Sequence, residues 1–128
     1  MTVDGTLPPL HALESEVMEE LWARSEATVR DVQEALNARG DKVRAYTTLL
    51  TVMTRLDAKG LLVRRRAGRL DVYAPALSRD EYLQRRAESE VAALVEDYGD
   101  LALAHFARQL GGLDPERLEK LRRLANDA

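Results

Sequence analysis

The segment LLVRRRAGRLDVYAP, residues 61–75, limits the possible folds more than any other part of the chain. Two short runs of strand-forming residues flank a turn at Ala67-Gly68-Arg69, which is typical of a β-hairpin. Four apolar residues can pack against the rest of the protein while the arginines point outward: Leu61, Val63, Leu70 and Val72. The segment therefore predicts one basic hairpin in a chain that is otherwise patterned for helices.

Three amphipathic helices are predicted before the hairpin. In the first, residues 10–23, apolar residues recur every three or four positions and leave an acidic outer face. The second lies within residues 27–40, where Thr28 can cap the helix N-terminus. The third occupies residues 45–60. Three helices followed by a basic hairpin predict a mainly α-helical fold, the winged helix-turn-helix.

The third predicted helix carries four threonines, although each lowers helix propensity by roughly a few tenths of a kcal/mol. At about 100° per residue, its apolar residues share one face: Leu49, Val52, Met53 and Leu56. The opposite face carries only short side chains: Thr47, Thr51, Thr54 and Ala58. Thr48 and Arg55 lie to one side of that face. Such a face lets a helix approach a duplex closely, where threonine hydroxyls and methyls can contact phosphates and bases. The alternatives are a plain solvated surface and hydroxyls that bond the backbone of their own helix.

Positive charge is concentrated in the same third of the chain. The net charge of the chain is −3, but residues 39–69 hold nine basic residues against two acidic ones. Residues 1–38 hold two basic residues against eight acidic ones. A clustered basic region matters more for binding a polyanion than the net charge does. The hairpin arginines therefore fit phosphate contacts, with an ordinary solvated strand as the alternative.

Residues 78–128 are predicted to form three further helices. Ser78 and Glu81 make a capping box for a long helix, residues 101–110 form a short apolar one, and Pro115 opens the last. A segment of this size is too small to be comfortably stable alone, and its apolar stripes have no visible partner. We expect a DNA-binding domain, residues 1–77, and a dimerisation domain, residues 78–128. The residues expected to pair with a second copy are Tyr82, Val91, Leu94, Val95, Leu103, Phe106, Leu118 and Leu121.

Several other classes of protein are disfavoured. The absence of cysteine excludes disulfides, thiolate metal sites and cysteine nucleophiles. His11 and His105 have no neighbours at metal-ligand spacing, and no phosphate loop or nucleophile motif stands out. We therefore expect neither an enzyme nor a bound cofactor or metal. No apolar run approaches the roughly 20 residues of a membrane span, and residues 1–10 lack the pattern of a secretory signal, so we expect a cytoplasmic protein.

Two segments, LESEVMEELWARSEATVRDVQEAL and AYTTLLTVMTRLDAKGLLVRRRAGRLDVYAP, resemble the penicillinase-repressor family, often called BlaI/MecI/CopY. The likeness runs from about Leu10 to Ala76 and continues more loosely through the C-terminal helices. It implies a dimeric transcriptional repressor whose third helix enters the major groove while the wing meets the DNA backbone. The implied operator is a palindrome with TACA and TGTA half-sites.

Carried onto this sequence, the resemblance implies roles for individual residues. Leu50 stands where several family members carry a basic residue, and Tyr46 would help at the phosphates. The implied DNA contacts, joined with the basic hairpin, are Tyr46, Thr47, Thr48, Thr51, Arg55, Arg64, Arg65, Arg66 and Arg69. The resemblance also implies inactivation by cleavage at His105-Phe106, where other members often carry Asn before the Phe, in a route that starts from a membrane-bound sensor protease. The copper-responsive branch uses a C-terminal cysteine cluster, which this chain lacks.

Two alternative functions fit the same patterns. One is a winged-helix module that binds another protein, so that the threonine face never meets DNA. The other is a repressor that senses a small molecule in a pocket between its two parts. The second is disfavoured because the chain offers few aromatic or polar residues to form such a pocket.

Overall fold

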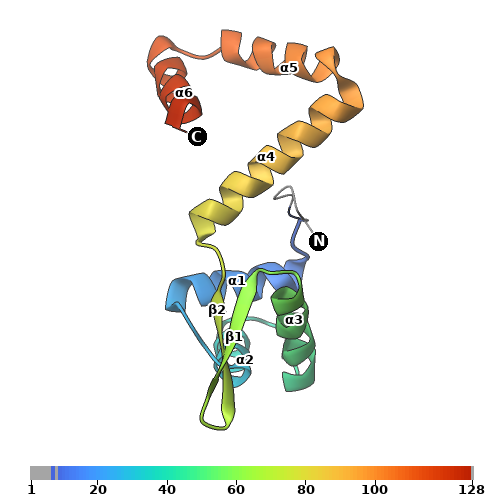
Figure 1. Cartoon of the computed structure of the whole chain (residues 1–128), viewed down its shortest axis with the longest axis vertical. Coiled ribbons are helices and arrows are strands. Elements are labelled where there is room, and N and C mark those ends of the chain that lie inside the picture. The colour runs from blue at the N-terminus through green and yellow to red at the C-terminus, as the bar shows by residue number, and fades with distance from the viewer. Residues whose placement is uncertain (1–6, 8, 128) are drawn as a thin grey trace. The chain divides into compact units, whose positions relative to one another are not determined.

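The computed structural model describes residues 7 and 9–127, so most of the N-terminal stretch considered for a secretory signal lies outside the described residues. Within them the chain forms six helices and one β-hairpin (Figure 1). It divides into two compact units, residues 1–86 and 87–128, whose boundary falls inside the fourth helix. The functional division after Leu77 stays a prediction.

The first unit has the predicted order of elements. Helices α1 (Ala12–Arg24), α2 (Val29–Arg39) and α3 (Tyr46–Ala58) precede strands β1 (Leu62–Ala67) and β2 (Leu70–Pro75). The strands pair antiparallel and form the two-stranded wing that is visible beside the helices in Figure 1. The predicted winged helix-turn-helix is therefore confirmed.

Local capping decides where the first two helices begin. The Thr28 hydroxyl accepts a hydrogen bond from the Asp31 N–H at 3.1 Å, and the Asp31 carboxylate accepts one from the Thr28 N–H at 3.1 Å, which confirms the predicted cap. Helix α1 begins at Ala12, two residues later than its apolar pattern suggested. The reason is that Glu14 accepts a hydrogen bond from the His11 backbone N–H at 3.0 Å and so fixes His11 as the cap.

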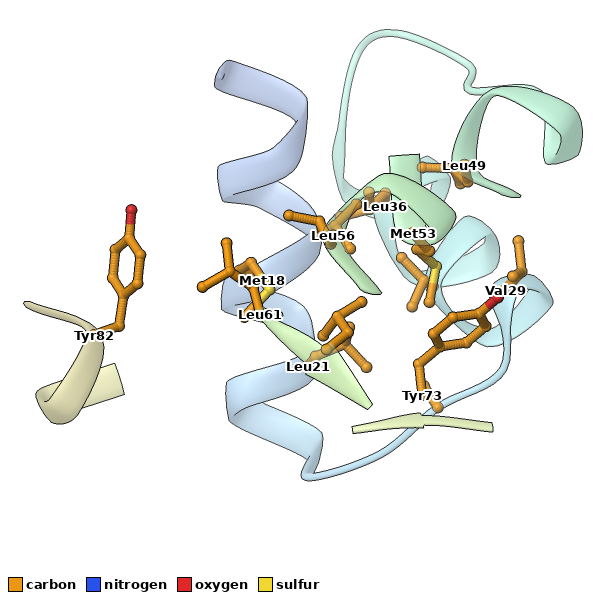
Figure 2. Packing of buried hydrophobic residues seen from close by; sticks show 14 of the residues in the cluster. Met18, Leu21, Val29, Leu36, Leu49, Met53, Leu56, Leu61, Tyr73 and Tyr82 are labelled. Atoms are coloured by element: carbon orange, nitrogen blue, oxygen red, sulfur yellow. The ribbon is translucent and has the colours of Figure 1, made fainter. Parts of the chain in front are cut away.

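Side chains from all three helices and the base of the hairpin converge on one core (Figure 2). The predicted inner face of α3 is confirmed, because Leu49, Met53 and Leu56 are completely buried there. The predicted acidic outer face of α1 is confirmed for Glu16 and Glu19, which are exposed, but two other glutamates turn inward. Glu14 and Glu20 are only 5% and 7% exposed, because basic side chains from later elements fold over them.

The hairpin packs differently from the sequence prediction. Leu61 is buried and Val72 is half-buried as expected, but Val63 and Leu70 are 55% and 60% exposed. Only the base of the hairpin lies over the core, and successive side chains on a strand point to opposite faces. The core therefore receives Leu62 and Tyr73 instead.

The wing is attached to the helices through the backbone of the α1–α2 loop. The Ala27 N–H donates to the Tyr73 carbonyl at 3.0 Å, and the Tyr73 N–H donates to the Ala27 carbonyl at 2.9 Å. Gly68 turns the chain between the strands with φ of 65°, a left-handed conformation that suits glycine. These bonds fix the position of the wing relative to α2.

The first turns of helix α4 (Arg79–Tyr98) belong to the first unit. The Trp22 indole N–H donates to the Leu77 carbonyl at 2.9 Å, and the Trp22 ring lies 5.5 Å from the ring of Tyr82. Tyr82 is 6% exposed. The chain beyond the wing is thus held against α1 before α4 leaves the core.

The second unit contains the rest of α4, together with α5 (Asp100–Gly111) and α6 (Pro115–Asp127). The predicted cap of the last helix is confirmed, since Asp114 accepts a hydrogen bond from the Arg117 N–H at 2.8 Å. None of the described residues after Tyr82 is buried within the single chain. No helix in the described part of the chain combines the length and apolar character needed to cross a bilayer.

Candidate nucleic-acid interface

The loop before α3 is pinned to α2 and so sets the position of α3. The Asn37 side chain accepts a hydrogen bond from the Arg44 backbone N–H at 2.7 Å and donates one to the Arg44 carbonyl at 3.1 Å. Gln33 donates a second hydrogen bond to the same carbonyl, at 3.2 Å. Two consecutive turns of α2 therefore hold the backbone that leads into α3. A helix whose entry is fixed in this way can present a defined face to a ligand.

The four threonines of α3 all face solvent, on the side opposite the buried leucines and methionine: Thr47, Thr48, Thr51 and Thr54. The Thr51 hydroxyl donates a hydrogen bond to the Thr47 carbonyl at 3.0 Å. For this threonine the alternative of a hydroxyl bonded to the backbone of its own helix is therefore confirmed. Its single proton is used, so Thr51 presents a methyl group and an oxygen that can only accept. The Thr48 hydroxyl makes no such bond within the described residues, so it can donate a hydrogen bond to a ligand.

The N-terminus of α3 is open toward an anion. Ala45 occupies the N-cap position, and its methyl side chain cannot accept a hydrogen bond from the first turn. The free N–H groups and the helix dipole both favour negative charge at this end. Tyr46, the first residue of α3, is 41% exposed, and the guanidinium of Arg30 lies 5.7 Å from the centre of its ring.

Most of the predicted basic cluster is already balanced by carboxylates. Of the nine basic residues between positions 39 and 69, six lie within 4.0 Å of a carboxylate oxygen: Arg39, Arg44, Lys59, Arg64, Arg65 and Arg66. The other three, Lys42, Arg55 and Arg69, form no ion pair within the described residues. The residue count in the sequence therefore overstates the positive charge that is free to meet a polyanion.

The wing arginines divide between two partners, as alternation along a strand requires. Arg66 lies 3.3 Å from Asp71 and Arg64 lies 4.0 Å from the same carboxylate. Arg65 points to the other face and forms two hydrogen bonds with the Glu26 carboxylate, at 3.0 and 3.1 Å. Such exposed pairs are worth only about 0–1 kcal/mol, so a phosphate can replace the carboxylate at little cost.

A more buried ion pair ties the C-terminal end of α3 to α1. The Lys59 ammonium lies 2.7 Å from a Glu14 oxygen, and the Glu14 side chain is only 7% exposed. Burial by itself raises the pKa of Glu14, but hydrogen bonds from Lys59 and from the His11 N–H, with the positive charges nearby, lower that pKa below its ordinary value. Glu14 therefore holds α3 in place as an ionised carboxylate.

The residues predicted for the tail lie in two different environments. Tyr82 is enclosed by the first unit, against Trp22, and so is not on the surface of the single chain. Exposed large side chains in the second unit include Val91, Leu94, Leu103 and Phe106, while Val95, Leu118 and Leu121 are half-buried. The peptide bond between His105 and Phe106 lies in the middle of α5.

Two cations near α3 were not among the predicted site residues. Arg30 follows the first residue of α2 and lies over the Tyr46 ring, and Lys42 lies in the loop before α3. Lys42 was counted in the basic cluster but given no role. Arg30 lies in the acidic part of the sequence, and the only signal for it was its exposed position directly after the capped start of α2. Sequence reasoning therefore missed a cation that the fold brings over the ring of the first residue of α3.

Comparison with known proteins agrees with the resemblance in the sequence. The model of the penicillinase repressor family matches residues 10–127. The transcriptional regulator BlaI of Mycobacterium tuberculosis (strain CDC 1551 / Oshkosh) is 42% identical over 117 residues, which make up 89% of this chain and 83% of that protein.

Two solved structures resemble the first unit. One is the DNA-binding domain of the repressor BlaI, which is 28% identical with a TM-score of 0.52 and covers 60% of this chain and 92% of that one. The other is the monomeric form of Bacillus licheniformis BlaI in complex with the blaP half-operator, also 28% identical, with a TM-score of 0.50 and the same coverage. Both support the winged-helix fold of the first unit.

Proposed function

Since this chain belongs to the penicillinase repressor family, we propose that it represses transcription by binding a palindromic DNA operator as a homodimer. The observation that carries the proposal is the exposed threonine face of α3, beside which Arg55 and Arg69 have no carboxylate partner within the described residues. With the wing beside it, this surface offers hydroxyls, methyl groups and guanidinium groups to one duplex. The chromosome as target makes the cytoplasm the proposed site of action.

In the proposed complex α3 lies in the major groove and the wing follows the neighbouring backbone. Thr47, Thr48 and Thr51 face the base edges, since short side chains let the helix approach the bases. Arg55 and the wing arginines contact phosphates, which fix position without reading sequence. The B. licheniformis relative, solved on a half-operator, supports this arrangement for the first unit.

The second unit supports dimerisation, because a single chain leaves its apolar side chains in water. Leu101 is 69% exposed and Phe106 is 37% exposed, and α5 and α6 contain no buried residue. Leu94, Leu101 and Phe106 line one apolar hollow, and exposed apolar clusters of this kind are typical of an association site. We assign the dimer surface to Val91, Leu94, Val95, Leu103, Phe106, Leu118 and Leu121, and leave out Tyr82, which is already enclosed.

Regulation by proteolysis at His105-Phe106 is part of the proposal. The bond lies inside α5, and proteases bind their substrates as extended chains, so the helix must open locally before cleavage. Cleavage there would divide the apolar surface and so weaken the dimer on the operator. The sensor protease that the family resemblance implies would start this process.

A DNA shift assay with the region upstream of the chain's own gene tests the proposed function. A specific complex should form at about 50 mM salt and weaken steeply by about 200 mM, because each neutralised phosphate adds to the salt dependence. The winged-helix protein-interaction module is the competing explanation. If no duplex shifts even at low salt, the protein-interaction function replaces the repressor.

A further inference from the structure

Arg30 is held in place by a ring and keeps its hydrogen-bonding capacity. Its guanidinium carbon lies 5.7 Å from the centre of the Tyr46 ring, a distance typical of a cation–π contact. A cation–π contact engages the ring face and uses no hydrogen-bond acceptor, so the N–H donors of the guanidinium stay available. Within the described residues Arg30 forms no hydrogen bond or ion pair. Arg30 is therefore a positioned cation whose N–H groups can donate hydrogen bonds to a ligand.

The same side chain lines a hollow between the start of α2, the start of α3 and the tip of the wing. The hollow has a volume of about 460 Å³. Arg30, Tyr46 and Leu50 line it from the helices, and Arg69 and Leu70 line it from the wing. Arg69 is exposed and, like Arg30, has no ion-pair partner among the described residues. Two unbalanced guanidinium groups from different elements thus share one hollow.

The carboxylates that also line this hollow are already engaged. Asp31 accepts a hydrogen bond from the Thr28 N–H at 3.1 Å in the cap of α2. Asp71 lies 3.3 Å from Arg66, on the wing. Neither carboxylate lies within 4.0 Å of Arg30 or Arg69 in any ion pair of the described chain. The charge of Asp71 is balanced by Arg66, and Asp31 is bonded into the helix cap, so the guanidinium donors of Arg30 and Arg69 stay open to an anion.

We propose that this hollow binds one backbone phosphate of the DNA, held by Arg30 and Arg69. The proposal rests on the proposed function and adds to it a residue of α2 that neither the sequence nor the family resemblance had assigned. Guanidinium groups bind phosphate oxygens through parallel N–H bonds, and the leucine side chains can lie against the adjoining sugar. The open first turn of α3 lies beside the hollow and favours the same charge.

A phosphate in this hollow would position α3 rather than read bases. It would bridge α2 and the wing on either side of the first turn of α3, and so set how far the threonine face enters the groove. Loss of Arg30 should therefore weaken binding to every duplex by a similar factor. The hollow is thus a positioning site for the sequence-reading face.

The test uses the full chain and a short palindromic duplex with TACA and TGTA half-sites. Each backbone phosphate in turn is replaced by an uncharged methylphosphonate, and the affinity is measured by fluorescence anisotropy. For the unvaried protein, one position in each half-site should cost about tenfold in affinity through the lost phosphate contact. Arg30→Gln should weaken binding to the unmodified duplex by a similar factor. In this variant the methylphosphonate at that same position should cause no further loss of affinity.

Two further variants make the result specific. Arg69→Gln should likewise abolish the loss of affinity caused by the methylphosphonate at that phosphate. Arg85→Gln, an equal charge change at an exposed position of α4, should show the same losses along the duplex as the unvaried protein. The site is overturned if Arg30→Gln shows the same loss of affinity at each methylphosphonate position as the unvaried protein. It is also overturned if these losses shrink equally at every position. If the unvaried protein binds no duplex, the proposed function itself fails along with the site, so the two failures are distinguishable.

Discussion

The Thr51 side chain of α3 donates its hydroxyl proton to the Thr47 carbonyl at 3.0 Å, whereas the neighbouring Thr48 makes no such bond within the described residues. Two threonines that look equivalent in the sequence therefore offer different chemistry to a ligand. Thr51 offers a methyl group and an acceptor, and Thr48 offers a donor as well. This difference separates their expected contributions to base recognition.

Thr48→Val should change half-site preference more than Thr51→Val does. Valine keeps the shape and removes the hydroxyl, so at position 48 it removes a free donor worth about 1 kcal/mol, or roughly fivefold in preference. At position 51 the hydroxyl proton is already bonded to the helix and the methyl contact survives, so valine removes only an acceptor and the change should be smaller, about twofold. Competition binding with single-base variants of the TACA half-site measures both values. Equal changes for the two variants would contradict the assignment.

Glu26→Gln should strengthen DNA binding at low salt. The substitution releases Arg65 from its two hydrogen bonds with the Glu26 carboxylate and removes a negative charge near the duplex. Because exposed pairs contribute about 0–1 kcal/mol, the gain should be about two- to fivefold and should fade as salt rises. Anisotropy titrations at several salt concentrations measure it. Glu34→Gln, an exposed carboxylate on α2, is the matched control and should change affinity less.

Arg55→Gln should weaken binding to all duplexes more than Arg65→Gln does. Arg55 has no carboxylate partner among the described residues, whereas the charge of Arg65 is already balanced by Glu26. Loss of one phosphate contact should reduce the slope of log affinity against log salt by about 1. The ranking should reverse or level out in the Glu26→Gln background, where Arg65 is released. If Arg55→Gln outweighs Arg65→Gln to the same extent with and without Glu26→Gln, then Glu26 does not restrain Arg65.

Glu14→Gln should destabilise the protein at neutral pH by about 1–3 kcal/mol, since it removes the charged partner of Lys59. The folded-state pKa of Glu14 lies below its ordinary value, so the stabilisation is present above the ordinary carboxyl range. It is lost as the pH falls through the folded-state value, and the two proteins should then converge. Denaturant unfolding at fixed protein concentration measures this. A difference that is constant down to acid pH would contradict an ionised Glu14.

The order of the helices and the starts of three of them could be predicted because they depend on local signals. Caps at Thr28, Ser78 and Asp114 mark helix starts in the sequence, and each makes the expected hydrogen bond. The threonine face of α3 followed from the periodicity of Leu49, Met53 and Leu56 alone. Such features need no knowledge of the partner element.

The charge pairing could not be predicted, because it joins residues far apart in the chain. Glu14 meets Lys59 across 45 positions, and Glu26 meets Arg65 across 39. The exposure of Val63 and Leu70 depends on where the core ends under the hairpin, which alternation does not reveal. Arg30 acquires its position only when α2 and α3 cross. The elements of the proposed DNA interface were thus predictable, while the cations without a carboxylate partner were not.

Leu94→Glu should convert the proposed dimer into monomers. Leu94 is 39% exposed in the single chain, and placing an unpaired carboxylate inside an apolar interface costs several kcal/mol, or about 100-fold or more in the dimer dissociation constant. Sedimentation velocity across a range of concentrations measures the change. Glu96→Gln, two residues away and also exposed, should leave the dimer intact. A dimer that persists in Leu94→Glu would remove this residue from the interface.

The stoichiometry of the complex on DNA shows whether two chains read one palindrome through α3. The unvaried protein is titrated into a palindromic duplex with TACA and TGTA half-sites, and into a scrambled duplex of equal composition, with sedimentation equilibrium as the readout. Two chains should bind each palindrome, with an affinity well above that for the scrambled duplex. Equal affinity for both duplexes, or no complex at about 50 mM salt, would contradict this prediction.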